Sequence, residues 1–184
     1  MAITKIQSES LNLADTYAFT GTVTGAGGVN TPSFFAYMSS NLNVSDNTNT
    51  IVPTNSEDYD IGGCFNNTGS STTLNGLTAP AYSFVPNVAG KYYIGGMINI
   101  QGGTSELIES HNYISKNAST FSHAYHANQN NYSNYQTNYM AVVVDLNGTG
   151  DYMQLVGRAV RNGTTSAFLA DTRGTFFHGY KIIE

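Results

Sequence analysis

The sequence predicts an all-β protein, built as a sandwich or barrel of about ten short strands behind an extended N-terminal arm. From residue 29 onward, short apolar and aromatic runs alternate with turn-forming Gly, Pro, Asn and Asp residues. No segment has the apolar spacing of a convincing helix. Charged residues make up only 10% of the chain, against about 25% in typical globular domains. Asn, Ser, Thr, Gly and Tyr replace them, and most of these are poor helix formers.

Residues 1–28 form the first predicted unit, an arm that ends in a Gly-rich hinge. Its apolar side chains are too few and too scattered to close a core. They are Ile3, Ile6, Leu11, Leu13, Tyr17 and Phe19. Residues 16–23 alternate as one strand does. We therefore expect an extended segment that docks on a partner, separate from a head domain at residues 29–184.

The head domain is predicted to consist of short strands joined by turns. The predicted strands are residues 32–40, 50–53, 59–67, 81–86, 91–101, 104–117, 140–146, 151–160, 166–171 and 175–183. Asn147-Gly148 predicts a hairpin between the strands on either side of it. Residues 122–139, rich in Tyr and Asn, are expected to form a long loop.

Four patches of the head domain, in order, resemble the jelly-roll heads of the complement and tumour-necrosis-factor superfamily. The patches are residues 32–41, 59–67, 82–96 and 176–184. The third is similar to the family's hallmark Phe-x-x-Pro-x-x-Gly-x-Tyr stretch, with Phe84 ahead of Pro86 and a glycine two residues ahead of Tyr92. The fourth resembles the closing strand, in which an aromatic residue is followed by Gly, a second aromatic residue and two aliphatic ones.

The resemblance implies a ten-stranded jelly roll that assembles as a homotrimer about a threefold axis. In such a fold the first and last strands are neighbours near the axis, and both termini leave at one end. Residues 34–37 and 176–180 are also too apolar for exposed edge strands, so we expect a subunit interface to cover them. The expected trimer-interface residues are Phe34, Phe35, Tyr37, Phe177 and Tyr180.

The N-terminal segment indicates a biological setting. Residues 2–28 resemble the attachment segment that precedes similar heads in structural proteins of marine bacteriophages. The first ten residues lack the apolar run of a secretion signal, and no run reaches the ~20 apolar residues of a membrane span. We therefore expect a structural protein of a phage virion, a trimeric fibre or capsid decoration protein bound to other virion proteins through the arm.

The alternative function is host attachment, with the head acting as a tail-fibre adhesin for a receptor or surface glycan. Tyr offers a rigid amphipathic face and Asn offers adaptable hydrogen bonds, a combination typical of contact surfaces. The expected contact residues are Tyr125, His126, Tyr132 and Tyr135. Ordinary strand packing at a trimer interface explains the same residues.

Two further groups of polar residues have both a metal-binding and a structural interpretation. The groups are His111, His123 and His126, and Asp145, Asn147 and Asp151. The histidines lack a nearby Cys or acid, which favours hydrogen-bonding loop histidines over a metal site. Calcium takes oxygen ligands such as those of the second group, but turn chemistry accounts for them equally. No metal or cofactor is therefore predicted.

Composition and motifs argue against catalysis and nucleic-acid binding. No nucleophile elbow, zinc-protease motif or phosphate loop is present. Asp58 and Asp60 share one strand face, as a glycosidase pair would, but a solvated face is the favoured interpretation. The net charge of −5 leaves no basic patch for nucleic acid. Cys64, the single cysteine, is interpreted as a small buried hydrophobic residue.

Overall fold

The computed structural model describes residues 30–103, 107–128, 133–163 and 165–182. The predicted arm, with its strand at 16–23 and its six apolar side chains, lies outside them. Within the described residues there is no α-helix, and the helical content is one 3₁₀ turn, η2 (Asp171–Arg173). These residues also hold no helix of the length and apolarity that crossing a bilayer requires. The prediction of an all-β fold is therefore confirmed.

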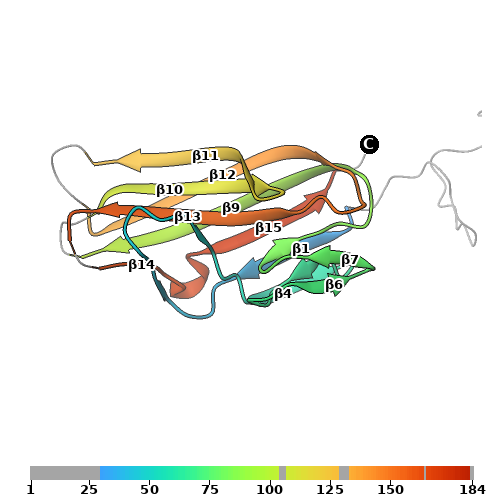
Figure 1. The fold of residues 1–184 in the computed structure, drawn as a ribbon, viewed down its shortest axis with the longest axis horizontal. Helices are drawn as coiled ribbons and strands as arrows, with labels where there is room; N and C mark the ends of the chain where they lie inside the picture. Colours follow the sequence, from blue (N-terminus) through green and yellow to red (C-terminus); the bar gives the residue numbers. More distant parts are fainter. Residues whose placement is uncertain (1–29, 104–106, 129–132, 164, 183–184) are drawn as a thin grey trace, which may run out of the picture.

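One of the two main sheets contains seven strands (Figure 1). They are β1 (Ser33–Tyr37), β2 (Leu42–Asn43), β4 (Ser56–Ile61), β9 (Gly90–Gly102), β12 (Tyr135–Leu146), β14 (Ser166–Phe168) and β15 (Phe176–Lys181). Their order is β2-β14-β9-β15-β1-β4, and β12 pairs with β9 along the edge that β14 and β15 leave open. In the antiparallel pair of β1 and β15, Ser33 lies opposite Tyr180. The first and last described strands are thus neighbours, as the resemblance implied.

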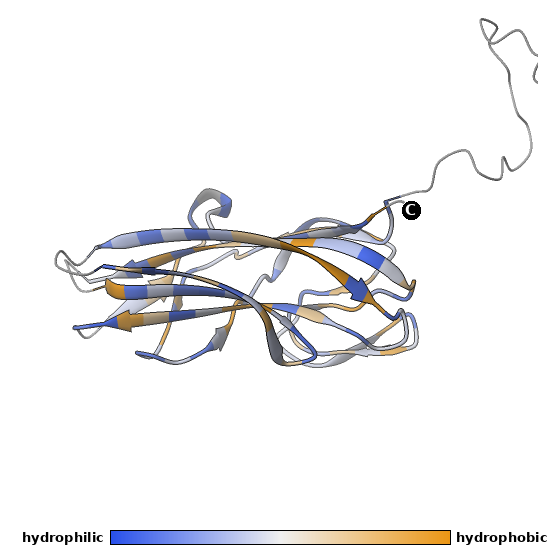
Figure 2. Ribbon diagram, turned by 90° about the horizontal axis from the view of Figure 1, so that it is seen from above, coloured by the Kyte–Doolittle hydropathy of each residue, from blue (hydrophilic) through white to orange (hydrophobic). Residues whose placement is uncertain are grey.

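The second sheet contains six strands and packs against the first, so that the molecule seen from above shows two layers (Figure 2). They are β3 (Thr50–Ile51), β5 (Phe65–Asn66), β8 (Ser83–Phe84), β10 (Leu107–Lys116), β11 (Ser119–Ala127) and β13 (Met153–Arg161). Their order is β11-β10-β13-β8-β5, and β3 pairs with β13. A separate small hairpin joins β6 (Thr72–Leu74) to β7 (Leu77–Ala79).

Two sequence predictions about the connections are wrong. The strands on either side of Asn147-Gly148 do not form a hairpin, because β12 pairs with β9 while β13 pairs with β10. The turn carries the chain from one sheet to the other instead. Residues 122–139 are not one long loop either, since β11 runs to Ala127 and β12 begins at Tyr135.

The core joins all four patches that carry the family resemblance. The Phe34 ring stacks on Phe65 at 4.7 Å and on Phe84 at 4.5 Å, and meets the edge of Phe177 at 5.0 Å between ring centroids. Tyr92 packs edge-on against Phe84 at 5.7 Å. All five side chains are buried between the sheets. Aromatic pairs at these separations contribute packing beyond the area they bury, so this cluster anchors the two layers.

Cys64 is fully buried beside this core, as the sequence predicted. Its Sγ lies 3.4 Å from the Gly62 carbonyl oxygen and 3.5 Å from Asn87 Oδ1. Burial raises the pKa of the thiol above its ordinary value, so the reactive thiolate is disfavoured.

We expect Cys64→Ala to lower the free energy of unfolding by about 1–2 kcal/mol, because it leaves a small cavity. The melting temperature of the native protein should be the same with and without a reducing agent. In the folded protein the thiol should resist alkylation until denaturant is added, which mass spectrometry measures. Rapid alkylation of the native protein would contradict the buried position.

Candidate functional site

The outward side of the seven-stranded sheet is rich in aromatic side chains. Successive residues of a strand point to opposite faces of the sheet. In β15, Phe177 and Gly179 are buried and face the core, while Phe176, His178 and Tyr180 are half-buried and face outward. The same alternation in β1, β9 and β12, together with the pairing of Tyr59 in β4 with Phe35, builds a continuous outer surface, which we call the aromatic face. It consists of Phe35, Tyr37, Tyr59, Tyr93, Tyr139, Phe176, His178 and Tyr180.

The rings of the aromatic face contact one another across strands. Phe35 stacks on Phe176 at 5.2 Å, and Tyr93 stacks on Tyr180 at 5.3 Å, between centroids. Large exposed apolar surfaces on soluble proteins mark sites of interaction. Tyr and Phe are also the residues enriched in the cores of protein interfaces. The geometry of this face therefore favours contact with another protein surface.

The centre of the aromatic face depends on Gly95 in β9. A Cβ at this position would lie 2.5 Å from His178 Nε2 and 2.7 Å from the Tyr139 hydroxyl, so these two side chains occupy the space above the glycine. The Tyr139 hydroxyl also lies 3.0 Å from the Tyr93 hydroxyl and 3.3 Å from His178 Nε2. Burial and the neighbouring Tyr93 raise the pKa of Tyr139 to about 12. Burial lowers the pKa of His178.

The structure divides the five residues expected at the trimer interface. Phe35, Tyr37 and Tyr180 lie on the aromatic face. Phe34 and Phe177 are fully buried in the core of the protomer, so their side chains do not reach a second copy. The expectation that residues 34–37 and 176–180 form edge strands is also wrong. β1 is flanked by β15 and β4, and β15 by β9 and β1, so neither is an edge strand.

Sequence reasoning missed Tyr93, Tyr139, Phe176 and His178, although they occupy the middle of the aromatic face. The signal that identifies Phe176 and His178 is the two-residue alternation with Phe177 and Gly179. Tyr93 and Tyr139 join them only through the pairing of β9 with β15 and β12. That pairing cannot be read from local pattern.

The residues expected to contact a glycan do not form one surface. Tyr125, 63% exposed, and His126 lie on β11 of the six-stranded sheet. As neighbours in a strand they point to opposite faces. Tyr135, 55% exposed, lies on β12 of the other sheet, where its hydroxyl accepts a hydrogen bond from Gln101 Nε2 at 3.0 Å. Tyr132 lies outside the described residues.

The histidines lie on strands and not in a loop, which corrects the sequence interpretation. His111 Nδ1 is 2.8 Å from His123 Nε2, and His111 Nε2 is 2.9 Å from Glu109 Oε2. The imidazole of His123 also stacks on Tyr113 at 4.2 Å. His126 pairs with Ser110, next to the pair of His111 and Tyr125. It therefore lies on the face of β11 opposite to that of His123 and Tyr125. Within the described residues, no three His, Cys, Asp or Glu side chains are grouped to hold a metal ion.

The candidate calcium ligands are engaged in the turn between β12 and β13. Asp151 accepts hydrogen bonds from Asn117 Nδ2 at 2.8 Å and from the Asn147 amide at 3.1 Å. It also forms an ion pair with Lys116 at 3.0 Å. These bonds lower the pKa of the Asp151 carboxyl, although partial burial opposes them. Asp145 stands apart on the exposed side of β12. Asn147 and Asp151 thus stabilise the turn.

Asp58 and Asp60 have different partners. Asp58 pairs with Arg173 at 2.6 Å. Asp60 accepts hydrogen bonds from the amides of Cys64 and Phe65, each at 3.0 Å, and so fixes the bend between β4 and β5. Both carboxylates therefore have structural partners.

The two sheets, their order and the adjacent first and last strands define a jelly roll of the tumour-necrosis-factor type. Crystal structures of murine APRIL, a protein of that family, share this fold. The structure at pH 5.0 aligns with a TM-score of 0.55 and 14% identity, over 82% of this chain and 98% of the chain in that crystal structure. The structure at pH 8.5 aligns over the same shares with a TM-score of 0.54 and 15% identity. At such identities the likeness concerns the fold alone. No known protein family and no curated protein matches the sequence.

His178 gives the protein an expected pH dependence. Burial lowers its pKa below the ordinary 6.5, so the unfolded chain takes up a proton more readily than the folded one. The stabilisation of the fold by the neutral His178 imidazole is therefore fully present at pH values above the unfolded pKa of 6.5. It is lost as the pH falls through 6.5 toward the lower pKa of the folded state. We expect the melting temperature to fall between pH 7.5 and 5, and less steeply in His178→Gln. The matched control is His126→Gln, which removes an exposed imidazole from β11 of the other sheet and leaves the aromatic face unchanged. Equal slopes in all three proteins would contradict the assignment.

Proposed function

We propose that the protein is a homotrimer whose aromatic faces pack together around a threefold axis, and that it is a non-enzymatic structural protein displaying this head on a bacteriophage particle. The aromatic face carries the assembly part of the proposal. Its half-buried rings lie on the sheet that contains the first and last described strands. A second and third copy would remove them from water, with a contribution of about 25 cal/mol for each Å² of apolar surface buried.

The position of the chain ends supports attachment from one side. The Lys181 amide donates to the Pro32 carbonyl at 3.2 Å, so the two ends of the head domain lie side by side. In a threefold assembly three N-terminal arms would then leave the same end of the trimer. Three linked arms bind a multivalent surface far more tightly than one does.

The virion location is inferred from the sequence of residues 2–28 and its likeness to phage attachment segments. The apolar residues of this arm would dock on another virion protein of the capsid or tail. The alternative, glycan binding by the exposed tyrosines, gains no support from their placement, because those described lie on both sheets.

Deletion of residues 2–24 tests both parts of the proposal. Analytical ultracentrifugation at micromolar concentration should show a trimer for the intact and the truncated protein, because the aromatic face is retained. The truncated protein should no longer join phage particles when it is supplied in trans during assembly. A monomeric intact protein would overturn the trimer. Normal incorporation of the truncated trimer would show that the head makes the contact.

A further inference from the structure

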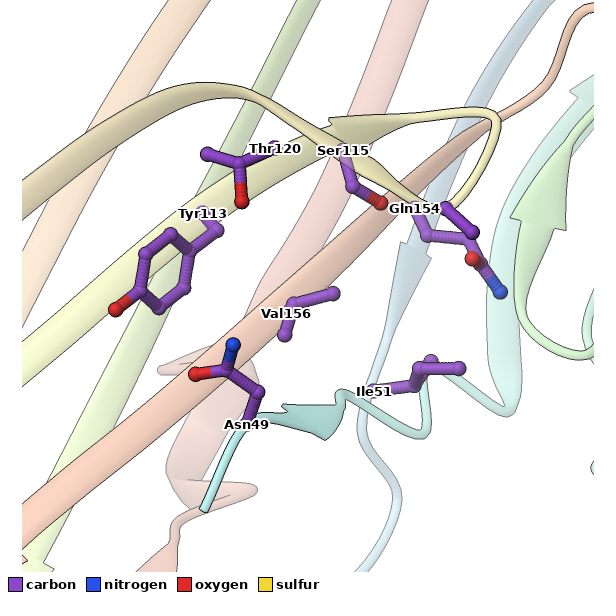
Figure 3. A pocket seen from close by; sticks show the side chains of 8 residues that line it. Asn49, Ile51, Tyr113, Ser115, Thr120, Gln154 and Val156 are labelled. Atoms are coloured by element: carbon purple, nitrogen blue, oxygen red, sulfur yellow. The ribbon is translucent and has the colours of Figure 1, made fainter. Parts of the chain in front are cut away.

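A groove of about 200 Å³ lies on the outer side of the six-stranded sheet (Figure 3). Two directly opposed pairs of residues from β10 and β13 make its floor: Tyr113 with Val156, and Ser115 with Gln154. Tyr113, Ser115 and Gln154 are at most 7% exposed. The floor is thus a deep and largely polar strip of the sheet.

The walls of the groove come from segments distant in the sequence. β3 supplies one wall through Ile51, which lies opposite Val156, and through the preceding Asn49. Strand β11 supplies the other wall through Thr120, which lies opposite Ser115. Figure 3 shows Asn49 and Ile51 across the floor strands from Thr120. Sheet pairing therefore holds both walls in register with the floor.

The floor contains a buried hydroxyl group that has no hydrogen-bond partner among the described residues. It is the Oγ of Ser115, a residue that is 5% exposed. Gln154, which also lines the groove, is held in place by the hydrogen bond that its Nε2 donates to the Ala81 carbonyl at 2.7 Å. Buried polar groups are nearly always hydrogen-bonded in native proteins, and exceptions call for a ligand, a water or an ion.

The chemistry of the groove selects a neutral ligand with hydroxyl groups. Ser115 Oγ both donates and accepts, whereas Gln154 Oε1 only accepts, and a hydroxyl group satisfies both. The residues that line the groove carry no charge, which favours a neutral ligand over an ionic one. Ile51 and Val156 provide an apolar surface for C–H groups. The volume is below the ~300–1,000 Å³ of pockets for drug-sized ligands, which indicates a single ring.

We propose that this groove binds one neutral sugar residue. Hydroxyl groups of the sugar meet Ser115 and Gln154, and its C–H face lies against Ile51 and Val156. The Tyr113 ring is held by stacking on His123, with centroids 4.2 Å apart and planes inclined by 10°, so this side of the floor is rigid before binding. The site lies within one protomer and on the sheet opposite the aromatic face, and it does not depend on trimerisation.

The test is a titration of the full-length protein with glucose, galactose, mannose and N-acetylglucosamine, each as the reducing sugar and as its methyl pyranoside, followed by NMR. At least one of these sugars should bind. Ser115→Val replaces the hydroxyl with methyl groups and should weaken binding at least tenfold. Thr120→Trp changes an exposed wall residue and should abolish binding by filling the groove. Tyr125→Ala, on the outer side of the same sheet but outside the groove, should bind as the wild type does.

The comparison of methyl glycosides with reducing sugars identifies the kind of ligand, and the variants test its position. Binding of methyl glycosides with the affinity of the reducing sugars, or better, identifies the terminal residue of a glycan chain as the ligand, and preference for the reducing sugars identifies a free monosaccharide. The absence of binding to every sugar overturns the proposal and leaves a water site. Binding lost in Tyr125→Ala but kept in Ser115→Val also overturns it. Sedimentation of the same proteins tests trimer formation separately. A trimer that binds no sugar would refute sugar binding in the groove and would leave the proposed assembly intact.

Discussion

Phe34→Ala is expected to lower the free energy of unfolding by about 3–5 kcal/mol, the usual effect of removing a large ring from a packed core. The Phe34 ring contacts Phe65, Phe84 and Phe177, which come from three other segments of the chain. Its loss would leave a cavity between the two sheets that the backbone hydrogen bonds of β1 prevent from closing. Chemical denaturation followed by circular dichroism measures the change.

The matched control for this prediction is the neighbouring residue. Phe35→Ala removes the same ring from the same strand, but on the aromatic face, where the side chain is half-buried. We expect it to lower the stability mainly at concentrations at which the protein is assembled and to have little effect at high dilution, because assembly stabilises the folded chain by mass action. If Phe34→Ala and Phe35→Ala lower the free energy of unfolding equally at high dilution, then successive residues of β1 do not alternate between the core and the surface.

Local pattern was sufficient to predict most of the strands and the all-β fold class, and the resemblance of four patches indicated the family of folds. The four patches recognised in the sequence contain Phe34, Phe65, Phe84, Tyr92 and Phe177, and the structure packs these five rings together. Each patch combines apolar residues with turn residues at its end, and both signals act over a few positions. Such signals survive in a single sequence, so the fold was predictable.

Partner choice between strands was not predictable in the same way. Asn147-Gly148 indicates a turn correctly, but a turn does not say whether the chain returns along the same sheet or crosses to the other. The groove shows the same limit. Asn49, Ser115 and Gln154 are distant in the sequence, and only the pairing of β3, β10 and β13 brings their segments together. Non-local pairing decides both features.

Tyr180→Asp is expected to abolish trimer formation while leaving the fold intact. Tyr180 is half-buried and stacks on Tyr93, so a carboxylate at this position would remain partly solvated in a single protomer. In a closed interface the same carboxylate would lose its water without gaining a partner. An uncompensated buried charge of this kind is destabilising by about 3–5 kcal/mol. The effect repeats in each of three subunits, so the dissociation constant should rise by more than about a thousandfold.

Sedimentation velocity at micromolar concentration measures this effect, and Tyr125→Asp is the matched control. Tyr125 is 63% exposed on the outer side of the six-stranded sheet, so a carboxylate there stays in water and the trimer should persist. Circular dichroism should show the same β content in both variants, because neither side chain belongs to the core. A trimer of Tyr180→Asp would place the subunit contact on another surface. Dissociation of both variants would indicate that an added negative charge disrupts the assembly wherever it is placed, and would not identify the aromatic face as the subunit contact.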